Sequence, residues 1–184
     1  MAAEYASGRI GSDGLPSVAD LLQAFRAPVN GRVRHRAVLI AAHELVACHE
    51  RRVSTLAGVH APGADSDQLI RCRQLMDDID DRRAEQVAGI DVWVAGNIAH
   101  RSGASLHTET LGAVIDRMAA KWVAAQHALG ISQINDKSRG HTTSRRREVD
   151  GEAHMHWVRL AELADGYKDL ITDVAEHRRR LPVF

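Results

Sequence analysis

The stretch LGAVIDRMAAKWVAAQHAL, residues 111–129, decides the fold class of this chain. Its large apolar side chains recur at helical spacing, at Leu111, Ile115, Met118, Trp122 and Leu129. The opposite side of the same helix has small and acidic residues, Glu109, Ala113, Asp116, Ala120 and Ala124. Because small side chains let neighbouring helices approach closely, we expect this helix to be packed on both sides and to lie at the centre of a bundle.

Four further segments have helical periodicity with start or stop signals at their ends. They cover about residues 15–27, 33–57, 65–99 and 152–180, with Pro28 stopping the first and Asp65 capping the third. The sequence therefore predicts an all-α fold, a single-domain bundle over residues 15–184 with about five helices, four long and one short and N-terminal. Residues 1–14 are rich in Gly, Ser and Ala and are expected to form a flexible N-terminal arm.

The central helix is expected to follow a cap at Ser105 or Thr108 and to end at Gly130. The polar residues 131–149 would then form a long loop, which could close over a ligand as a lid. No run of alternating β-branched or aromatic residues predicts a strand, and the sequence has no internal repeat.

Composition restricts the partners of this chain. Its 184 residues include 24 basic and 24 acidic side chains, so no net field draws it to nucleic acid or to an acidic membrane. The sequence has no basic start followed by an apolar run, and no uncharged apolar segment of about 18 residues. We expect a cytoplasmic protein without membrane insertion and without a nucleic-acid partner. Cys48 and Cys72 lie in helical patterns without a CxxC partner, and we expect them to be packing residues.

Charged or polar side chains interrupt two apolar stripes, where burial is costly unless the group is paired or used. His49 lies in the middle of the stripe of the helix at 33–57, either as a hydrogen-bonded core histidine or as a catalytic or ligating group. Its neighbour Glu50 and His43, seven residues before Glu50, share a flank and could line one groove. In the helix at 65–99 Arg83 occupies the seam and needs a carboxylate partner.

The candidate partners of Arg83 are Asp77 and Asp80 on its own helix, or a carboxylate across the bundle, and such a pair could be purely structural. On the central helix Glu109 and Asp116, seven residues apart, are expected to be partly buried. They could perform acid/base chemistry or hold a cation, or they could neutralise Arg83 and Arg117.

Several known motifs are absent from the sequence. His43-Glu44 and His49 do not form HExxH, because the second histidine comes six residues after the first. No Glu is followed three residues later by His, and there is no glycine-rich nucleotide or flavin loop, so no nucleotide, flavin or di-iron motif is present. The cofactor is therefore unknown, and a divalent metal is one option. The basic runs at 139–147 and 178–180 are expected to be solvated, unless the first closes over an anionic ligand.

Three segments together resemble a known family. They are LHTETLGAVIDRMAAKW at 106–122, RQLMDDIDDRRAEQVAGID at 73–91 and VACHERRV at 46–53. They are similar to the bacterial "domain of unknown function 4254" family, most specifically in the TET…IDR block, with a looser pattern at Asp77, Asp80, Arg83 and Asp91. The resemblance implies a helical fold and a setting among genes for surface glycolipids or specialised metabolites. The resemblance implies a Glu-Asp pair at the position where this chain has His49-Glu50.

Two hypotheses for the function follow. The first is an enzyme acting on a small polar metabolite, with Glu109, Asp116, His49 and Glu50 as catalytic residues. Substrate contacts would come from Arg83, Arg117, Asp77, Asp80 and His43. A mutase or lyase of the chorismate mutase kind is one variety, prompted by the RQLMDDID run. The second is a non-catalytic module, a homodimer or a partner-binding protein, in which the same charges form a buried ion-pair network.

Overall fold

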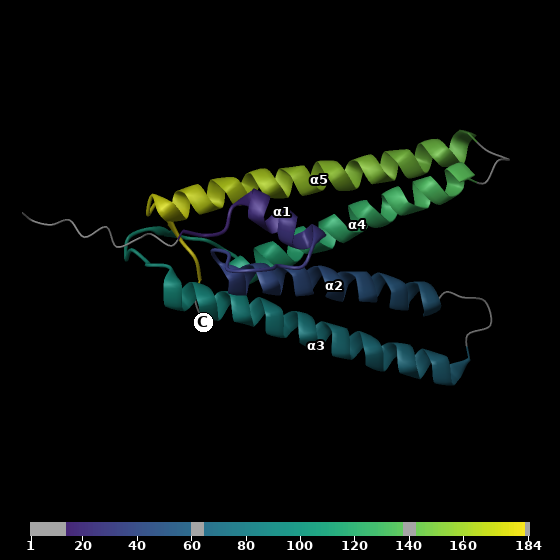
Figure 1. The fold of residues 1–184 in the computed structure, drawn as a ribbon, viewed down its shortest axis with the longest axis horizontal. Helices are drawn as coiled ribbons and strands as arrows, with labels where there is room; N and C mark the ends of the chain where they lie inside the picture. The colour runs from purple at the N-terminus through teal and green to yellow at the C-terminus, as the bar shows by residue number, and fades with distance from the viewer. Residues whose placement is uncertain (1–13, 60–64, 138–142, 183–184) are drawn as a thin grey trace, which may run out of the picture.

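The computed structural model describes residues 14–59, 65–137 and 143–182. The predicted N-terminal arm, apart from Gly14, lies outside these residues. The described elements, in chain order, are α1 (Val18–Arg26), α2 (Arg36–Val59), α3 (Ser66–Asn97), β1 (Ser105–Leu106), α4 (Leu111–Lys137), α5 (Thr143–Ala175) and β2 (Arg179–Arg180). The prediction of an all-α bundle is confirmed, since the helices account for nearly all of the regular structure (Figure 1).

The helices form two antiparallel hairpins, α2 with α3 and α4 with α5, and α1 lies against α2 and α5 (Figure 1). The predicted central position of α4 is confirmed, because α4 contacts α2, α3 and α5. Side chains of all five helices share one core cluster, which includes Leu21, Leu45, Ile90, Ile115 and Leu170. In the part of the chain that the structure describes, no helix is both long and apolar enough to cross a membrane.

The starts of two helices are as the sequence indicates. Ser17 and Asp20 form a capping box at the start of α1, each side chain bonding the other residue's backbone N–H. The predicted cap Asp65 accepts a 2.7 Å hydrogen bond from the backbone N–H of Gln68 and opens α3. These local bonds satisfy N–H groups that a helix leaves open at its first turn.

The prediction that α4 ends at Gly130 is wrong, since the helix continues to Lys137. The predicted polar loop at 131–149 is therefore mostly helical, because α5 already begins at Thr143. Of residues 131–149, only 138–142 are not described by the structure. The described part of this range is helical and does not form the long loop that was predicted as a lid. A glycine inside a helix costs about 1 kcal/mol, and the extensive packing of α4 on α5 offsets this cost.

The cap of α4 also differs from the prediction. Thr110 caps the helix, its Oγ1 accepting a 3.2 Å hydrogen bond from the backbone N–H of Ala113. The candidate Ser105 instead lies in β1, which pairs in parallel with β2. These two short strands were not predicted, because a two-residue strand has no periodicity to read.

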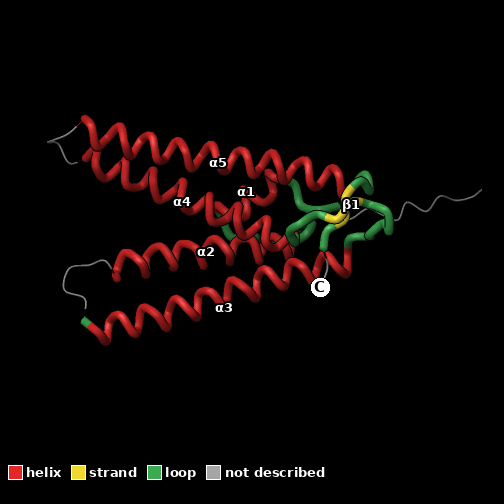
Figure 2. Tube along the Cα trace, turned by 180° about the vertical axis from the view of Figure 1, so that it is seen from behind, coloured by secondary structure: helices red, strands yellow, loops and turns green. Residues whose placement is uncertain are grey.

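The last helix ends before the predicted residue 180. It ends at Ala175, where His177 adopts a positive φ of 56° and the N–H of Arg178 bonds the carbonyl of Asp173 at 2.8 Å. This left-handed turn is a common helix C-terminus. It redirects the chain so that β2 reaches β1, at the end of the bundle where the loops gather (Figure 2).

Candidate functional site

A solvent-open cavity of about 610 Å³ lies between α3 and α4. Its lining combines small and apolar side chains with three carboxylates and one guanidinium: Asp80, Arg83, Ala84, Val87, Ala88, Asp91, Val92, Ala113 and Asp116. The small residues predicted on the second side of the central helix include Ala113, which faces this space. A cavity of this size can accommodate a small metabolite.

Asp116 is the most enclosed charged group for which the structure gives a partner on each oxygen. Its Oδ1 is 2.8 Å from His49 Nε2, and its Oδ2 accepts a 3.1 Å hydrogen bond from Arg83 Nε. The side chains of His49 and Asp116 are only 13% and 15% exposed. The position of His49 on the inward face of α2 is as predicted, and its partner lies on α4, 67 residues away.

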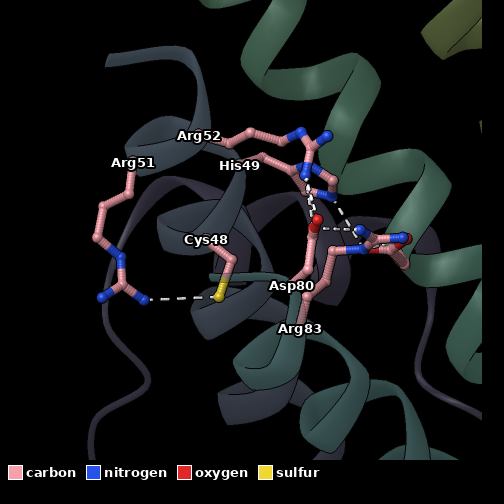
Figure 3. Close-up of polar contacts among 7 residues, drawn as sticks. Cys48, His49, Arg51, Arg52, Asp80 and Arg83 are labelled. Carbon is pink, nitrogen blue, oxygen red and sulfur yellow. Dashed lines mark hydrogen bonds and ion pairs between the residues drawn. The ribbon is translucent and has the colours of Figure 1, made fainter. Parts of the chain in front are cut away.

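Asp80 continues this chain of contacts towards solvent. It accepts a 2.9 Å hydrogen bond from Arg83 Nη1, and Arg52 Nη1 lies 2.5 and 2.7 Å from its two oxygens. The hydrogen bond from Arg52 holds the pKa of Asp80 below its usual value of 3.8, and Arg83 adds to the effect. Figure 3 shows His49, Arg52, Asp80 and Arg83 converging from α2 and α3. We call the set His49, Arg52, Asp80, Arg83 and Asp116 the charged chain.

Asp91, on the wall of the cavity, was not among the candidate site residues from sequence. Its Oδ1 accepts a 2.8 Å hydrogen bond from the backbone N–H of Gly112, at the start of α4. Burial raises the pKa of Asp91, although the bonds from Gly112 and Thr110 act in the opposite direction. A signal was present, because Asp91 follows Asp80 by eleven residues, about three helical turns, and so shares its face.

Arg52 was also missed from the sequence. It follows His49 by three residues and so lies on nearly the same face of α2. That spacing alone gives no reason to prefer Arg52 over its neighbour Arg51, which instead bonds the backbone carbonyl of Ala47 at 3.4 Å and Cys48 Sγ at 3.6 Å.

Three of the predicted site residues that do not line the cavity also take no part in the charged chain or in another predicted ion pair. His43 Nδ1 is 2.8 Å from the carbonyl oxygen of Ala24, so His43 joins α2 to α1. Glu50 and Asp77 are exposed and do not line the cavity. The single groove expected for His43, His49 and Glu50 is therefore not formed.

Glu109 and Arg117 make a separate, exposed ion pair. Arg117 Nη1 and Nη2 donate to Glu109 Oε1 and Oε2 at 2.9 and 2.7 Å. Glu109 precedes the first residue of α4. It therefore does not share a helix face with Asp116, as the sequence had predicted for one continuous helix. The alternative in which the two carboxylates neutralise Arg83 and Arg117 agrees with the observed pairing.

The arrangement supports anion binding and proton transfer. Among the described residues Arg83 Nη2 has no hydrogen-bond partner, so a ligand in the cavity can use its donors. Asp116 is a proton acceptor at the cavity wall, with His49 behind it to share or stabilise its charge. Within residues 14–59, 65–137 and 143–182, no three His, Cys, Asp or Glu side chains gather closely enough to hold a metal ion.

Two other cavities contain none of the predicted site residues. One, of about 330 Å³, lies between α1 and the start of α2, and the other is near the β1–β2 pair. Of the acidic and basic site residues predicted from sequence, Asp80, Arg83 and Asp116 line the α3–α4 cavity, whereas Glu109 and Arg117 pair outside it.

Comparison with known proteins agrees with the resemblance seen in the sequence. A family model described as "Protein of unknown function (DUF4254)" matches residues 40–183. No curated protein and no solved structure matches the chain. The matched range contains the whole charged chain and the α3–α4 cavity, and it excludes α1.

Proposed function

The chain belongs to the DUF4254 family, and on that premise we propose that it is an enzyme acting on a small, anionic polar metabolite in the α3–α4 cavity. The observation that supports this proposal is the contact of one carboxylate, Asp116, with both His49 and Arg83 at the wall of that cavity. A hydrogen-bonded His–Asp pair beside an arginine combines a proton-transfer group with an anion-binding group.

In this proposal Arg83 Nη2 binds the anionic group of the substrate. Asp116 accepts a proton from another part of the same substrate molecule. His49 acts through Asp116, because His49 does not line the cavity. Its Nε2–H donates to Oδ1 of Asp116 and holds that oxygen in place. Oδ2, on the Arg83 side, is then the oxygen that takes the proton. Glu50 and Glu109 have no role in this mechanism, because neither lines the cavity.

The apolar part of the cavity restricts the substrate further. Ala84, Val87, Ala88 and Val92 leave room for a compact carbon skeleton, which would lie against them while its charged end meets Arg83. A carboxylic acid or a sugar derivative with one acidic group has this combination.

The cellular setting is also a proposal. On the family resemblance, we infer a bacterial enzyme that acts in the biosynthesis of surface glycolipids or specialised metabolites. We further propose a cytoplasmic location, as expected from the sequence, and a homodimer. Light scattering of the purified chain tests the dimer, and a monomer at all concentrations would contradict it.

A non-catalytic, partner-binding module is the second candidate. It is favoured by the mutual pairing of Asp80, Arg83 and Asp116, which leaves no charge of this set without a counter-ion in the chain. Val92 at the cavity is 70% exposed, which would suit contact with another protein.

Thermal-shift measurements against sugar nucleotides, small carboxylic acids and divalent metals test the proposal. We expect at least one anionic compound to raise the melting temperature of the native chain and of the Glu109→Gln control, and not that of Asp116→Asn. The control removes a carboxylate of the same helix end that lies outside the cavity. If Asp116→Asn shows the same shift as the native chain, the proposed site is wrong. If no compound shifts the native chain, and Asp116→Asn only destabilises it, the second candidate is favoured.

A further inference from the structure

Three consecutive arginines, Arg178 and the two residues of β2, have different surroundings. Arg178 donates from Nε and Nη2 to Asp173 Oδ1 at 2.9 and 2.7 Å, and it also forms an ion pair with Glu176. Arg179 Nε lies 3.4 Å from Asp173 Oδ2. Arg180 has no carboxylate partner among the described residues, although it is partly buried. From the sequence, the three arginines were expected to form one solvated basic run. In the structure, Arg180 differs from the other two because it has no carboxylate partner among the described residues.

Arg180 lines a cavity of about 520 Å³ beyond the C-terminal end of α3. The other lining residues are His100, Arg101, Ser102, Gly103 and Ala104. No acidic residue lines this space, and neither His100 nor Arg101 pairs with a carboxylate within the described residues. None of the lining residues lines the α3–α4 cavity. We call this space the basic cavity.

The parallel pairing of β1 and β2 places Arg180 beside Leu106, at the end of the turn that contains Arg101. The N–H of Ser105 donates to the carbonyl of Arg178 at 3.1 Å, and the N–H of His107 donates to the carbonyl of Arg180 at 2.8 Å. Residues more than seventy positions apart are thereby held side by side at the loop end of the bundle (Figure 2). Such pairing limits the motion of the backbone beneath the side chain of Arg180.

We propose that the basic cavity binds a phosphate group, as a phosphate monoester or a diphosphate. Two guanidinium groups supply forked N–H donors that match phosphate oxygens, and the Ser102 hydroxyl supplies another donor. The imidazole ring of His100 supplies a further N–H donor. Gly103 has open space where a Cβ would stand, so a ligand can approach the backbone there. This inference stands independently of the proposed enzymatic function.

Calorimetric titration of the full chain with inorganic pyrophosphate tests the site. We expect saturable binding that weakens at least about tenfold in Arg101→Gln/Arg180→Gln, because two charge-assisted contacts are lost. The control Arg71→Gln/Arg73→Gln removes the same charge from exposed positions near the other end of α3, and its affinity should stay within about twofold of the native value. Equal losses in both double variants would overturn the proposal. Arg101→Gln alone, at an exposed position, keeps the test available if the double variant does not fold.

The phosphate could belong to a soluble metabolite or to a phospholipid headgroup, and a second arm separates these sources. Vesicles of phosphatidylcholine, with or without phosphatidic acid, are sedimented with the native chain and with both double variants. Binding that requires phosphatidic acid and is lost only in Arg101→Gln/Arg180→Gln identifies a headgroup. Pyrophosphate binding without vesicle binding identifies a soluble phosphate compound. Failure of both probes to bind the native chain would refute the phosphate site.

Discussion

Oδ1 of Asp91 on α3 accepts a 2.8 Å hydrogen bond from the backbone N–H of Gly112, in the first turn of α4. The N–H groups of that turn lack partners within their own helix, so a carboxylate from a neighbouring helix stabilises them and interacts favourably with the positive end of the helix dipole. The bond also brings the two helices close together at one end of the proposed site. Asp91 therefore connects the packing of α3 on α4 with the shape of the cavity.

Substituting Gly112 should test how close this approach is. A Cβ on Gly112 would come within 2.5 Å of the carbonyl oxygen of Val87 and 3.0 Å of Asp91 Oδ1. We expect Gly112→Ala to lower the free energy of unfolding by about 1–3 kcal/mol, as for other overpacked sites. Urea denaturation measures this change. Gly89→Ala is the control, because its Cβ would meet no atom, and it should stabilise α3 by about 0.5–1 kcal/mol. Equal effects at the two glycines would contradict the close contact.

The raised pKa of Asp91 predicts a pH-dependent contribution to stability. Because burial raises this pKa above 3.8, the folded chain holds the proton more tightly than the unfolded chain. The contribution is fully present below 3.8 and is lost as the pH rises through the folded-state pKa. The unfolding free energy of the native chain relative to Asp91→Asn should therefore fall as the pH rises from below 3.8, as measured by urea denaturation across a pH series.

Asp80 serves as the opposite case for the same experiment. Its pKa is lowered by Arg52, so its contribution is present above 3.8 and is lost as the pH falls. The native chain relative to Asp80→Asn should show the reverse slope, reduced by solvent because Asp80 is substantially exposed. If the difference in unfolding free energy between the native chain and Asp91→Asn does not change with pH, burial does not perturb the pKa of Asp91.

Two arginines of similar exposure should differ in their contribution to stability. Arg83→Met leaves Oδ2 of the enclosed Asp116 without its donor, and we expect a loss of about 1–3 kcal/mol. Arg117→Met breaks only the exposed pair with Glu109 and should cost less than about 1 kcal/mol. Thermal and urea unfolding of the two variants give the comparison. An Arg117→Met variant as unstable as Arg83→Met would contradict the explanation that the low exposure of Asp116 makes the loss of its donor costly.

Filling the α3–α4 cavity should separate ligand binding from stability. Ala88 is exposed and lines the cavity, so Ala88→Trp places a large ring in it with a change in unfolding free energy within about 0.5 kcal/mol. We expect any ligand found by thermal shift to lose its effect in this variant. Ala57→Trp, at an exposed alanine of α2 outside the cavity, is the matched control and should retain the effect. Retained binding in Ala88→Trp would move the ligand site elsewhere.

The sequence by itself determined the helices and their inward faces. Helical period and local caps depend on residues within a few positions of one another, which is why the cap Asp65, the central position of α4 and the inward position of His49 were predicted correctly. Gly130 was misread because propensity is a weak local cost, and packing of α4 on α5 outweighs it.

Only the tertiary structure decided which charges meet. Asp116 joins His49 and Arg83 across 67 and 33 residues of chain, whereas Glu109 turns to Arg117 and Glu50 stays in solvent. The rotation and axial offset of neighbouring helices set these partners, and they result from the packing of whole faces. The same reason applies to the basic cavity, which Arg101 and Arg180 line together at the end of the bundle where β1 pairs with β2.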